Sequence, residues 1–167
     1  MKKSLALGAL ILASGLAGCE SMREPGSGLP QGAAVTRTHL GQPIARGEIR
    51  VEPSSDAAAS PEFTQEEAAV GRELARLGWT VLPAKTTTEQ VALVRVNQIA
   101  GPGSRVRTDM RVRIQRRSDA TVSWEGRAEM EARAGSAMAA RGAAVDALAA
   151  ALFRDFPGES GRTIRVR

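Results

Sequence analysis

Cys19 is the only cysteine of the 167-residue chain, and its surroundings predict a chemical modification. It follows a short apolar run (Leu5 to Ala17) that comes after a pair of lysines, and the small residues Ala17 and Gly18 leave an unhindered cleavage site. The apolar run is too short for a transmembrane helix, which takes about 20 residues. We therefore expect residues 1–18 to be a signal peptide that is removed in front of Cys19.

The sequence Leu16-Ala17-Gly18-Cys19 closely resembles the lipobox of bacterial lipoproteins. In these proteins the cysteine thiol is alkylated by diacylglycerol, and the chain is cut just before the cysteine. The resemblance implies lipidation of Cys19, and two or three acyl chains of the palmitate type would hold the protein on a membrane permanently. Glu20, in place of an aspartate, implies sorting to the outer membrane, facing the periplasm. The alternative is an ordinary secretory signal that leaves the Cys19 thiol free.

Cleavage before Cys19 would leave 149 of the 167 residues and no thiol for a disulfide, although the periplasm is oxidising. The formal charge would fall from +5 to +3 with the loss of Lys2 and Lys3. This modest charge is no evidence for nucleic-acid binding. We expect residues 19–32, rich in glycine and proline, to be a flexible tether. Residues 33–167 are long enough for one domain with its own core.

The remaining residues do not predict a catalytic site, a metal centre or a cofactor. His39 is the only histidine, so neither a His/Cys metal cluster nor a Cys/His dyad can form. A site made of carboxylates alone stays conceivable, and we expect His39 to be a partly exposed strand residue. The segments Gly101-Pro102-Gly103-Ser104 and Gly158-Glu159-Ser160-Gly161 are typical of turns, not of a phosphate loop or a nucleophile elbow.

Three arginines, Arg113, Arg116 and Arg117, form a candidate anion site. They lie at the end of a strand whose other charges we expect to pair with carboxylates on the next strand. Without partners they would attract lipopolysaccharide phosphates or another acidic polymer of the envelope. The alternative is a solvated surface that binds nothing.

The hydrophobic pattern indicates the elements that position these residues. Helix signals extend from Ser60, a possible N-cap, with Pro61 as first helical residue, to Gly78, and a second helix is expected from Ser136 to about Asp155. Strands are expected at these segments: Ala33 to Leu40, Ile44 to Glu52, Trp79 to Leu82, Gln90 to Ile99, Arg105 to Ile114, Val122 to Glu131 and Thr163 to Val166. The run Gln90 to Ile99 is apolar on both sides, which predicts a central strand. The five aromatic side chains should pack in the core.

The strands from Arg105 and from Val122 alternate so regularly that we expect a hairpin with one wet face. Opposite charges support a directly opposed pair, and like charges destabilise it. Pairing Ile114 with Val122 sets Arg111 against Glu125, and every further charged pair is then complementary. We predict this register, closed by a three-residue loop, and reject a shift by two residues that would set Arg111 against Arg127.

Three motifs behind the lipobox resemble the bacterial lipoprotein family catalogued as domain of unknown function 4136. They are Leu74-Ala75-Arg76-Leu77-Gly78-Trp79, Trp124-Glu125-Gly126, and Leu152-Phe153-Arg154-Asp155-Phe156-Pro157-Gly158. The resemblance covers nearly everything from Val35 onward and implies an α+β envelope lipoprotein with no catalytic residues to transfer. Thr38 departs from the family pattern, in which an aromatic residue lies between Arg37 and His39.

We therefore expect an α+β fold, with a largely antiparallel sheet and two helices packed on one face. The leading functional hypothesis is a lipid-anchored, non-enzymatic binding or accessory module of the cell envelope. Its partners would be the membrane, through Cys19, and an envelope protein or anionic polymer. The alternatives are a hydrolase of envelope polymers that uses carboxylates, and a carrier of lipid or anionic ligands.

Overall fold

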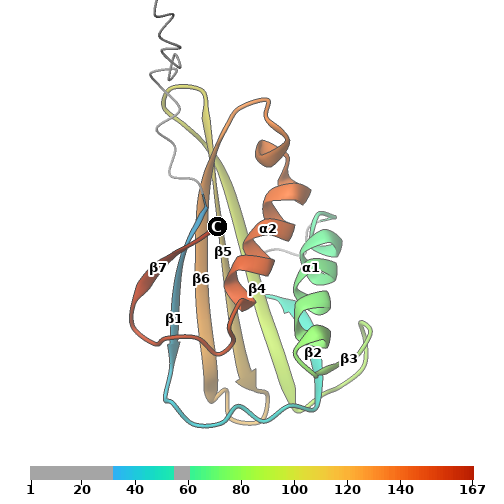
Figure 1. Cartoon of the computed structure of the whole chain (residues 1–167). Helices are drawn as coiled ribbons and strands as arrows, with labels where there is room; N and C mark the ends of the chain where they lie inside the picture. The colour runs from blue at the N-terminus through green and yellow to red at the C-terminus, as the bar shows by residue number, and fades with distance from the viewer. Residues whose placement is uncertain (1–31, 55–60) are drawn as a thin grey trace, which may run out of the picture.

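The computed structural model describes residues 32–54 and 61–167, so Cys19 and nearly all of the expected tether lie outside the described residues. In chain order the elements are β1 (Ala33–His39), β2 (Glu48–Pro53), α1 (Phe63–Arg76), β3 (Thr80–Val81), β4 (Gln90–Gly101), β5 (Arg105–Arg116), β6 (Val122–Arg133), the 3-10 turn η1 (Ala137–Ala139), α2 (Arg141–Phe153) and β7 (Thr163–Val166). The predicted α+β class is confirmed, with both helices on one face of the sheet (Figure 1).

The sheet has the strand order β3-β2-β4-β5-β6-β1-β7. Strand β2 is parallel to β3 and to β4, and the other neighbours are antiparallel. The central position predicted for Gln90 to Ile99 is confirmed by β4. Ala92, Val94 and Val96 of this strand belong to the buried core.

Aromatic side chains fill the space between sheet and helices. Trp124 and Phe153 are fully buried and stack with ring centroids 5.3 Å apart. Phe156 contacts Trp124 at 5.2 Å and meets Trp79 edge-on at 5.3 Å. Phe63 is partly buried against the same core, so the predicted core role of all five aromatics is confirmed.

Helix α1 ends as the sequence predicts and begins later. Gly78 has φ +98°, its N–H donates to the carbonyl of Ala75, and the N–H of Trp79 donates to the carbonyl of Leu74. This pair of bonds is the Schellman motif, which favours glycine at the left-handed position. The expectation of Pro61 as the first helical residue is wrong, because Glu62 is the N-cap and Pro61 lies in the preceding turn.

Two expected elements are shorter in the structure. The second helix starts at Arg141, because Ala140 is extended (ψ 128°) and the Ala139 carbonyl accepts a hydrogen bond from the Gln98 side chain. Strand β2 starts at Glu48 and not at Ile44. The preceding carbonyl of Ala45 accepts a side-chain N–H in place of a strand partner.

The predicted register of the β5–β6 hairpin is wrong by two residues. Arg111 lies opposite Arg127 and Ile114 opposite Trp124, the arrangement that the charge rule rejected. The rule failed because arginine reaches diagonally across a sheet, where neighbours are about 7–8 Å apart. The ion pairs Arg105–Glu131 (3.5 Å), Arg107–Glu129 (2.7 Å) and Arg111–Glu125 (3.3 Å) all form along the diagonal.

The turn of this hairpin also differs from the predicted three-residue loop. The N–H of Arg116 donates to the carbonyl of Thr121, so four residues lie between them, with Ala120 at φ +56°. Ser123 is an extra residue between two paired positions, a β-bulge whose hydroxyl donates to the carbonyl of Ile114. The bulge turns Val122 outward, where it is 38% exposed.

Arg37 is a buried cation on the helix-facing side of β1, only 2% exposed. Its guanidinium donates to the carbonyls of Ala151 (3.0 Å), Leu152 (2.9 Å) and Arg154 (2.8 Å) at the end of α2. Burial lowers the pKa of Arg37, and the nearby charge of Asp155 acts in the opposite direction. Arg37 therefore joins β1 to the negative end of the α2 dipole.

Candidate binding groove at one end of the sheet

A groove of about 330 Å³ opens where the chain passes from β1 to β2, beside the β5–β6 turn. Figure 1 shows this end of the sheet at the bottom of the view. Leu40 is 82% exposed and Val122 is 38% exposed, so two large apolar side chains of the groove meet water. Its other apolar lining residues are Pro43, Ile44 and Ala45.

Two amide side chains give the groove unused hydrogen-bonding capacity. Gln42 and Gln115 line it, and neither makes a side-chain hydrogen bond to another described residue. Each primary amide offers two donors and one acceptor oxygen. Apolar surface beside unused amides fits a ligand with apolar side chains on a polar backbone, as in a peptide.

The wall of the groove is fixed to the hydrophobic core through Gln90. The Gln90 amide nitrogen donates to the carbonyl of Ala45 (3.1 Å), and its amide oxygen accepts from the indole N–H of Trp79 (3.0 Å). Trp79 itself is 3% exposed. The β1–β2 connection is therefore held in place by the first residue of β4.

His39, the last residue of β1, fixes the backbone at the point where the chain passes from β1 into the groove lining. The N–H of Gly41 donates to Nδ1 (3.1 Å), so the ring proton lies on Nε2, which donates to the carbonyl of Gly158 (2.9 Å). The side chain is half-buried. The prediction of a partly exposed strand residue is confirmed, and both ring nitrogens are used for structure.

The three arginines of the predicted anion site all have carboxylate partners, contrary to the expectation that they are unpaired. Arg113 pairs with Glu125 (3.0 Å), Arg116 with Asp119 (2.8 Å), and Arg117 with Glu52 (2.7 Å). The reason is that two of the partners lie outside the opposed strand, in the turn and on β2. Anion binding at these arginines stays a prediction.

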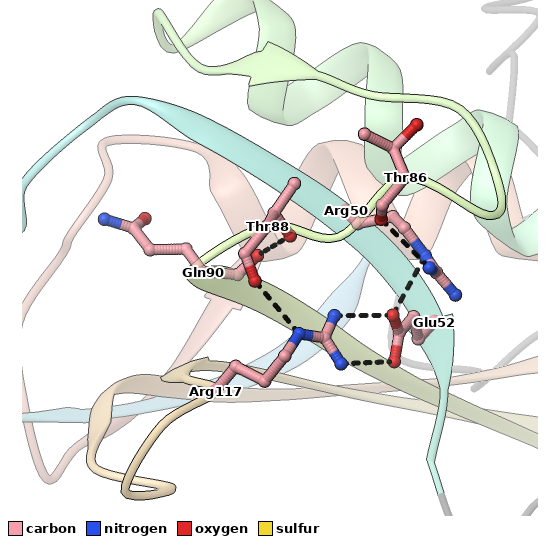
Figure 2. Close-up of polar contacts among 6 residues, drawn as sticks. All are labelled: Arg50, Glu52, Thr86, Thr88, Gln90 and Arg117. Carbon is pink, nitrogen blue, oxygen red and sulfur yellow. Dashed lines mark hydrogen bonds and ion pairs between the residues drawn. The ribbon is translucent and has the colours of Figure 1, made fainter.

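Arg117 is the centre of a polar network that connects three segments (Figure 2). Its guanidinium meets the Glu52 carboxylate of β2 and also donates to the carbonyl of Thr88 (2.9 Å). A Glu52 carboxylate oxygen also lies 2.9 Å from Nε of Arg50, and Nη1 of Arg50 donates to the carbonyl of Thr86 (3.0 Å). The hydrogen bond that Arg117 donates to the Glu52 carboxylate raises the pKa of Arg117.

The hairpin turn next to this network has its own acceptor. The Asp119 carboxylate accepts a hydrogen bond from the backbone N–H of Thr121 (3.0 Å). Hydrogen bonding to Thr121 holds the pKa of Asp119 below its ordinary value. The turn therefore has a defined shape beside the groove, which also contains Thr121.

Among the residues that the structure describes, one carboxyl is buried, and it lies away from the groove between the two helices. Glu66 is 4% exposed and accepts a hydrogen bond of 2.5 Å from Arg141. Burial raises the pKa of Glu66, and Arg141 acts in the opposite direction. The same guanidinium also pairs with the Glu62 carboxylate (3.3 Å).

Two features are absent from residues 32–54 and 61–167. No group of three His, Cys, Asp or Glu side chains in these ranges could hold a metal ion. No helix in them has both the length and the apolar character needed to cross a membrane.

Comparison with known proteins gives a short sequence match. No family profile matches the chain, so the resemblance to family 4136 gains no support from this comparison. An uncharacterized protein of Zymomonas mobilis is 42% identical over 64 residues, which are 38% of this chain. The match spans only 24% of the Zymomonas protein.

Solved structures share the fold. The PelC dodecamer of Paraburkholderia phytofirmans matches with a TM-score of 0.50 and 14% identity, over 71% of this chain and 94% of that one. A PDZ domain protein of Parabacteroides distasonis also gives 0.50, with 12% identity, over 79% of this chain and 37% of that one. A Caulobacter crescentus structure described as a "putative lipoprotein" gives a TM-score of only 0.37, with 16% identity, over 64% of this chain and 82% of that one. At these identities the first two matches show the α+β fold and nothing about function.

Sequence reasoning missed the groove itself. Its lining comes from residues as far apart as Leu40, Gln90 and Val122, and only the sheet brings them together. The sequence offered one local signal, the apolar residue Leu40 directly before the turn-forming residues Gly41-Gln42-Pro43. Because the chain turns there, the Leu40 side chain is not directed into the core.

Proposed function

We propose that the chain is a lipid-anchored lipoprotein of the bacterial cell envelope, held on the periplasmic side of the outer membrane through Cys19. The lipobox-like sequence supports the anchor. The family 4136 resemblance belongs to the same proposal. In this role the protein is a binding module, and its groove takes an extended apolar segment of an envelope protein.

The exposure of Leu40 at the groove is the observation that carries the binding proposal. Leu40 follows the last residue of β1, whereas the chain toward Cys19 leaves from the first residue. Seven strand residues at about 3.3 Å each separate these points by about 23 Å. An anchored domain would therefore present the groove away from its point of attachment.

A photoreactive side chain introduced at Val122 tests the groove in intact cells. We expect it to capture a protein that the same group at Met138, exposed near η1, does not capture. Burying a leucine is worth about 1.5–3 kcal/mol, so Leu40→Asp should reduce capture at least about tenfold. Met138→Asp is the matched control and should leave capture unchanged. Equal capture from both sites, or full capture by Leu40→Asp, would contradict the proposal.

Mass spectrometry of the natural product tests the anchor separately. The expected first residue is a diacylglyceryl-modified Cys19, and Cys19→Ser should release the protein from membranes. An intact leader or an unmodified thiol in the natural product would show the anchor to be wrong.

A further inference from the structure

The face of the sheet that the helices leave open carries an excess of positive charge at the end where β1 begins. Arg105 lies directly opposite Arg133, and Arg107 lies opposite Ile99, so these side chains share one face. Arg165 of β7 lines a hollow on this face together with Arg107. We call these five residues the basic end: Ile99, Arg105, Arg107, Arg133 and Arg165.

The carboxylates nearby neutralise only part of this charge. Glu131 pairs with Arg105 and Glu129 with Arg107. Within the described part of the chain, Arg133 and Arg165 have no ion-pair partner. Like charges directly opposite each other destabilise a strand pair, as Arg105 and Arg133 do here. An external anion next to them would remove that cost.

The basic end also exposes an apolar side chain. Ile99 is 58% exposed and lies among arginines. A guanidinium pairs with phosphate through two parallel hydrogen bonds, and an aliphatic side chain gains by leaving water. A phospholipid surface offers both an anionic headgroup and an apolar layer beneath it.

The position of the tether favours a membrane over a soluble polymer. The described chain begins at Gly32, next to β1, which starts at the same end of the sheet as the β4–β5 turn (Figure 1). Thirteen residue steps separate Gly32 from Cys19, and a chain cannot extend by more than about 3.6 Å per step, or about 47 Å in total. If Cys19 is anchored, Gly32 always stays within that distance of the headgroups, and the basic end lies at the same end of the sheet as Gly32.

We propose that the basic end docks on the anionic phospholipid headgroups of the membrane to which the chain is anchored, so that the groove points away from it. This inference rests on the proposed lipidation of Cys19. Each arginine near an anionic surface favours docking by about fivefold. The docked population should therefore depend on anionic lipid and fall at high salt.

The experiment uses the full lipidated chain in phosphatidylcholine vesicles with or without phosphatidylglycerol. Pro102→Cys places a thiol for an environment-sensitive dye in the β4–β5 turn, and Leu40→Cys places one at the opposite end. Headgroup nitroxides should quench the dye at position 102 more strongly than the dye at position 40, and only when phosphatidylglycerol is present. Equal quenching in the two kinds of vesicle would overturn docking.

Charge variants test the residues directly. Arg133→Gln with Arg165→Gln should lower the ratio of docked to undocked chain about 25-fold, from about fivefold per arginine. Arg46→Gln with Lys85→Gln removes the same charge elsewhere and should leave quenching unchanged. If both pairs act alike, the basic end is not the docking surface. If soluble polyphosphate shifts the dye at position 102 while anionic vesicles do not, the face binds an acidic polymer and the proposal is wrong.

Labelling of the unsubstituted chain separates this inference from the proposed anchor. A lipidated Cys19 has no thiol left to react, whereas an unmodified Cys19 takes up one dye. A chain that takes up dye refutes the anchor, and a chain that takes up none but shows no dependence on anionic lipid refutes docking alone.

Discussion

We expect Arg37→Met to remove the main cap of helix α2 and to destabilise the folded chain strongly. The last four carbonyls of a helix have no partner within it. In α2, Arg37 supplies donors to three of them, those of Ala151, Leu152 and Arg154. The fourth, that of Phe153, receives a longer bond of 3.4 Å from Arg76. Methionine keeps the apolar stem of Arg37 and removes every donor.

The size of the effect follows from these bonds. A hydrogen bond to a charged group contributes about 1.5–3 kcal/mol, so three give an upper range of about 4.5–9 kcal/mol. Water can replace the donor at the part-buried carbonyl of Arg154. We therefore expect a loss near the lower limit, about 4 kcal/mol. This is a large part of the about 5–15 kcal/mol that stabilises a typical domain.

Urea unfolding followed by circular dichroism measures this loss. With a slope of about 2 kcal/mol per M, a loss of 4 kcal/mol lowers the midpoint by about 2 M. Arg76→Met is the matched control, because it removes the longer bond of a guanidinium that is 56% exposed, and the midpoint should move by less than about 0.5 M. Arg37→Lys keeps the charge without the planar fork and should lie between the two. Equal midpoints for Arg37→Met and Arg76→Met would refute the capping role.

Three further outcomes test the packing, the buried acid and the register. Gly126→Ala would place a Cβ atom 2.4 Å from the indole of the same strand and should cost about 1–3 kcal/mol in unfolding free energy, whereas Gly47→Ala, with open space around it, should change it by less than about 0.5 kcal/mol. Burial raises the pKa of Glu66 above its ordinary value of 4.5, so its stabilisation is complete below that value and is lost as pH rises through the folded-state pKa. The stability of the parent relative to Glu66→Gln should therefore fall as pH rises above about 4.5, and a flat or rising difference would contradict the shift. In a Cys19→Ser background, Arg111→Cys with Arg127→Cys should form a disulfide on oxidation, because these residues are directly opposed. Arg111→Cys with Glu125→Cys should not form one, because the diagonal distance of about 7–8 Å is too long for a disulfide.

Elements with a strong local signal were predictable from the sequence. Alternation over ten residues predicted each of β5 and β6, which have twelve residues in the structure, and Gly78 after Leu77 predicted the end of α1. The start of α2 was not predictable, because Ala140 is extended for a tertiary reason, the bond from Gln98 to the neighbouring carbonyl. The hydrophobic pattern of a helix cannot indicate a hydrogen bond to Gln98, which is 41 residues away from Ala139.

The candidate groove was less predictable than the fold, whereas the buried position of Arg37 in the fold could have been inferred from the sequence. Ala33 and Val35 face the core, so strand alternation points Arg37 inward as well. A charged residue at an inward position needs a buried partner, and the end of a helix supplies several carbonyls. By contrast, the groove depends on the β-bulge at Ser123, which turns Val122 outward, and strict alternation predicted the opposite.

The register of the β5–β6 hairpin is fixed by packing on the covered face of the sheet and not by charges on the open face. Arg107 pairs with Glu129 diagonally in the observed register and would pair with it directly in the predicted one, so the same ion pair is compatible with both. Exposed ion pairs contribute little in either geometry. On the covered face the observed register sets the fully buried side chains of Ile114 and Trp124 directly opposite each other. The predicted pairing would instead have placed Ile114 against Val122, which is 38% exposed. The burial of Ile114 against Trp124 therefore decides the register, and the charges on the open face adapt to it.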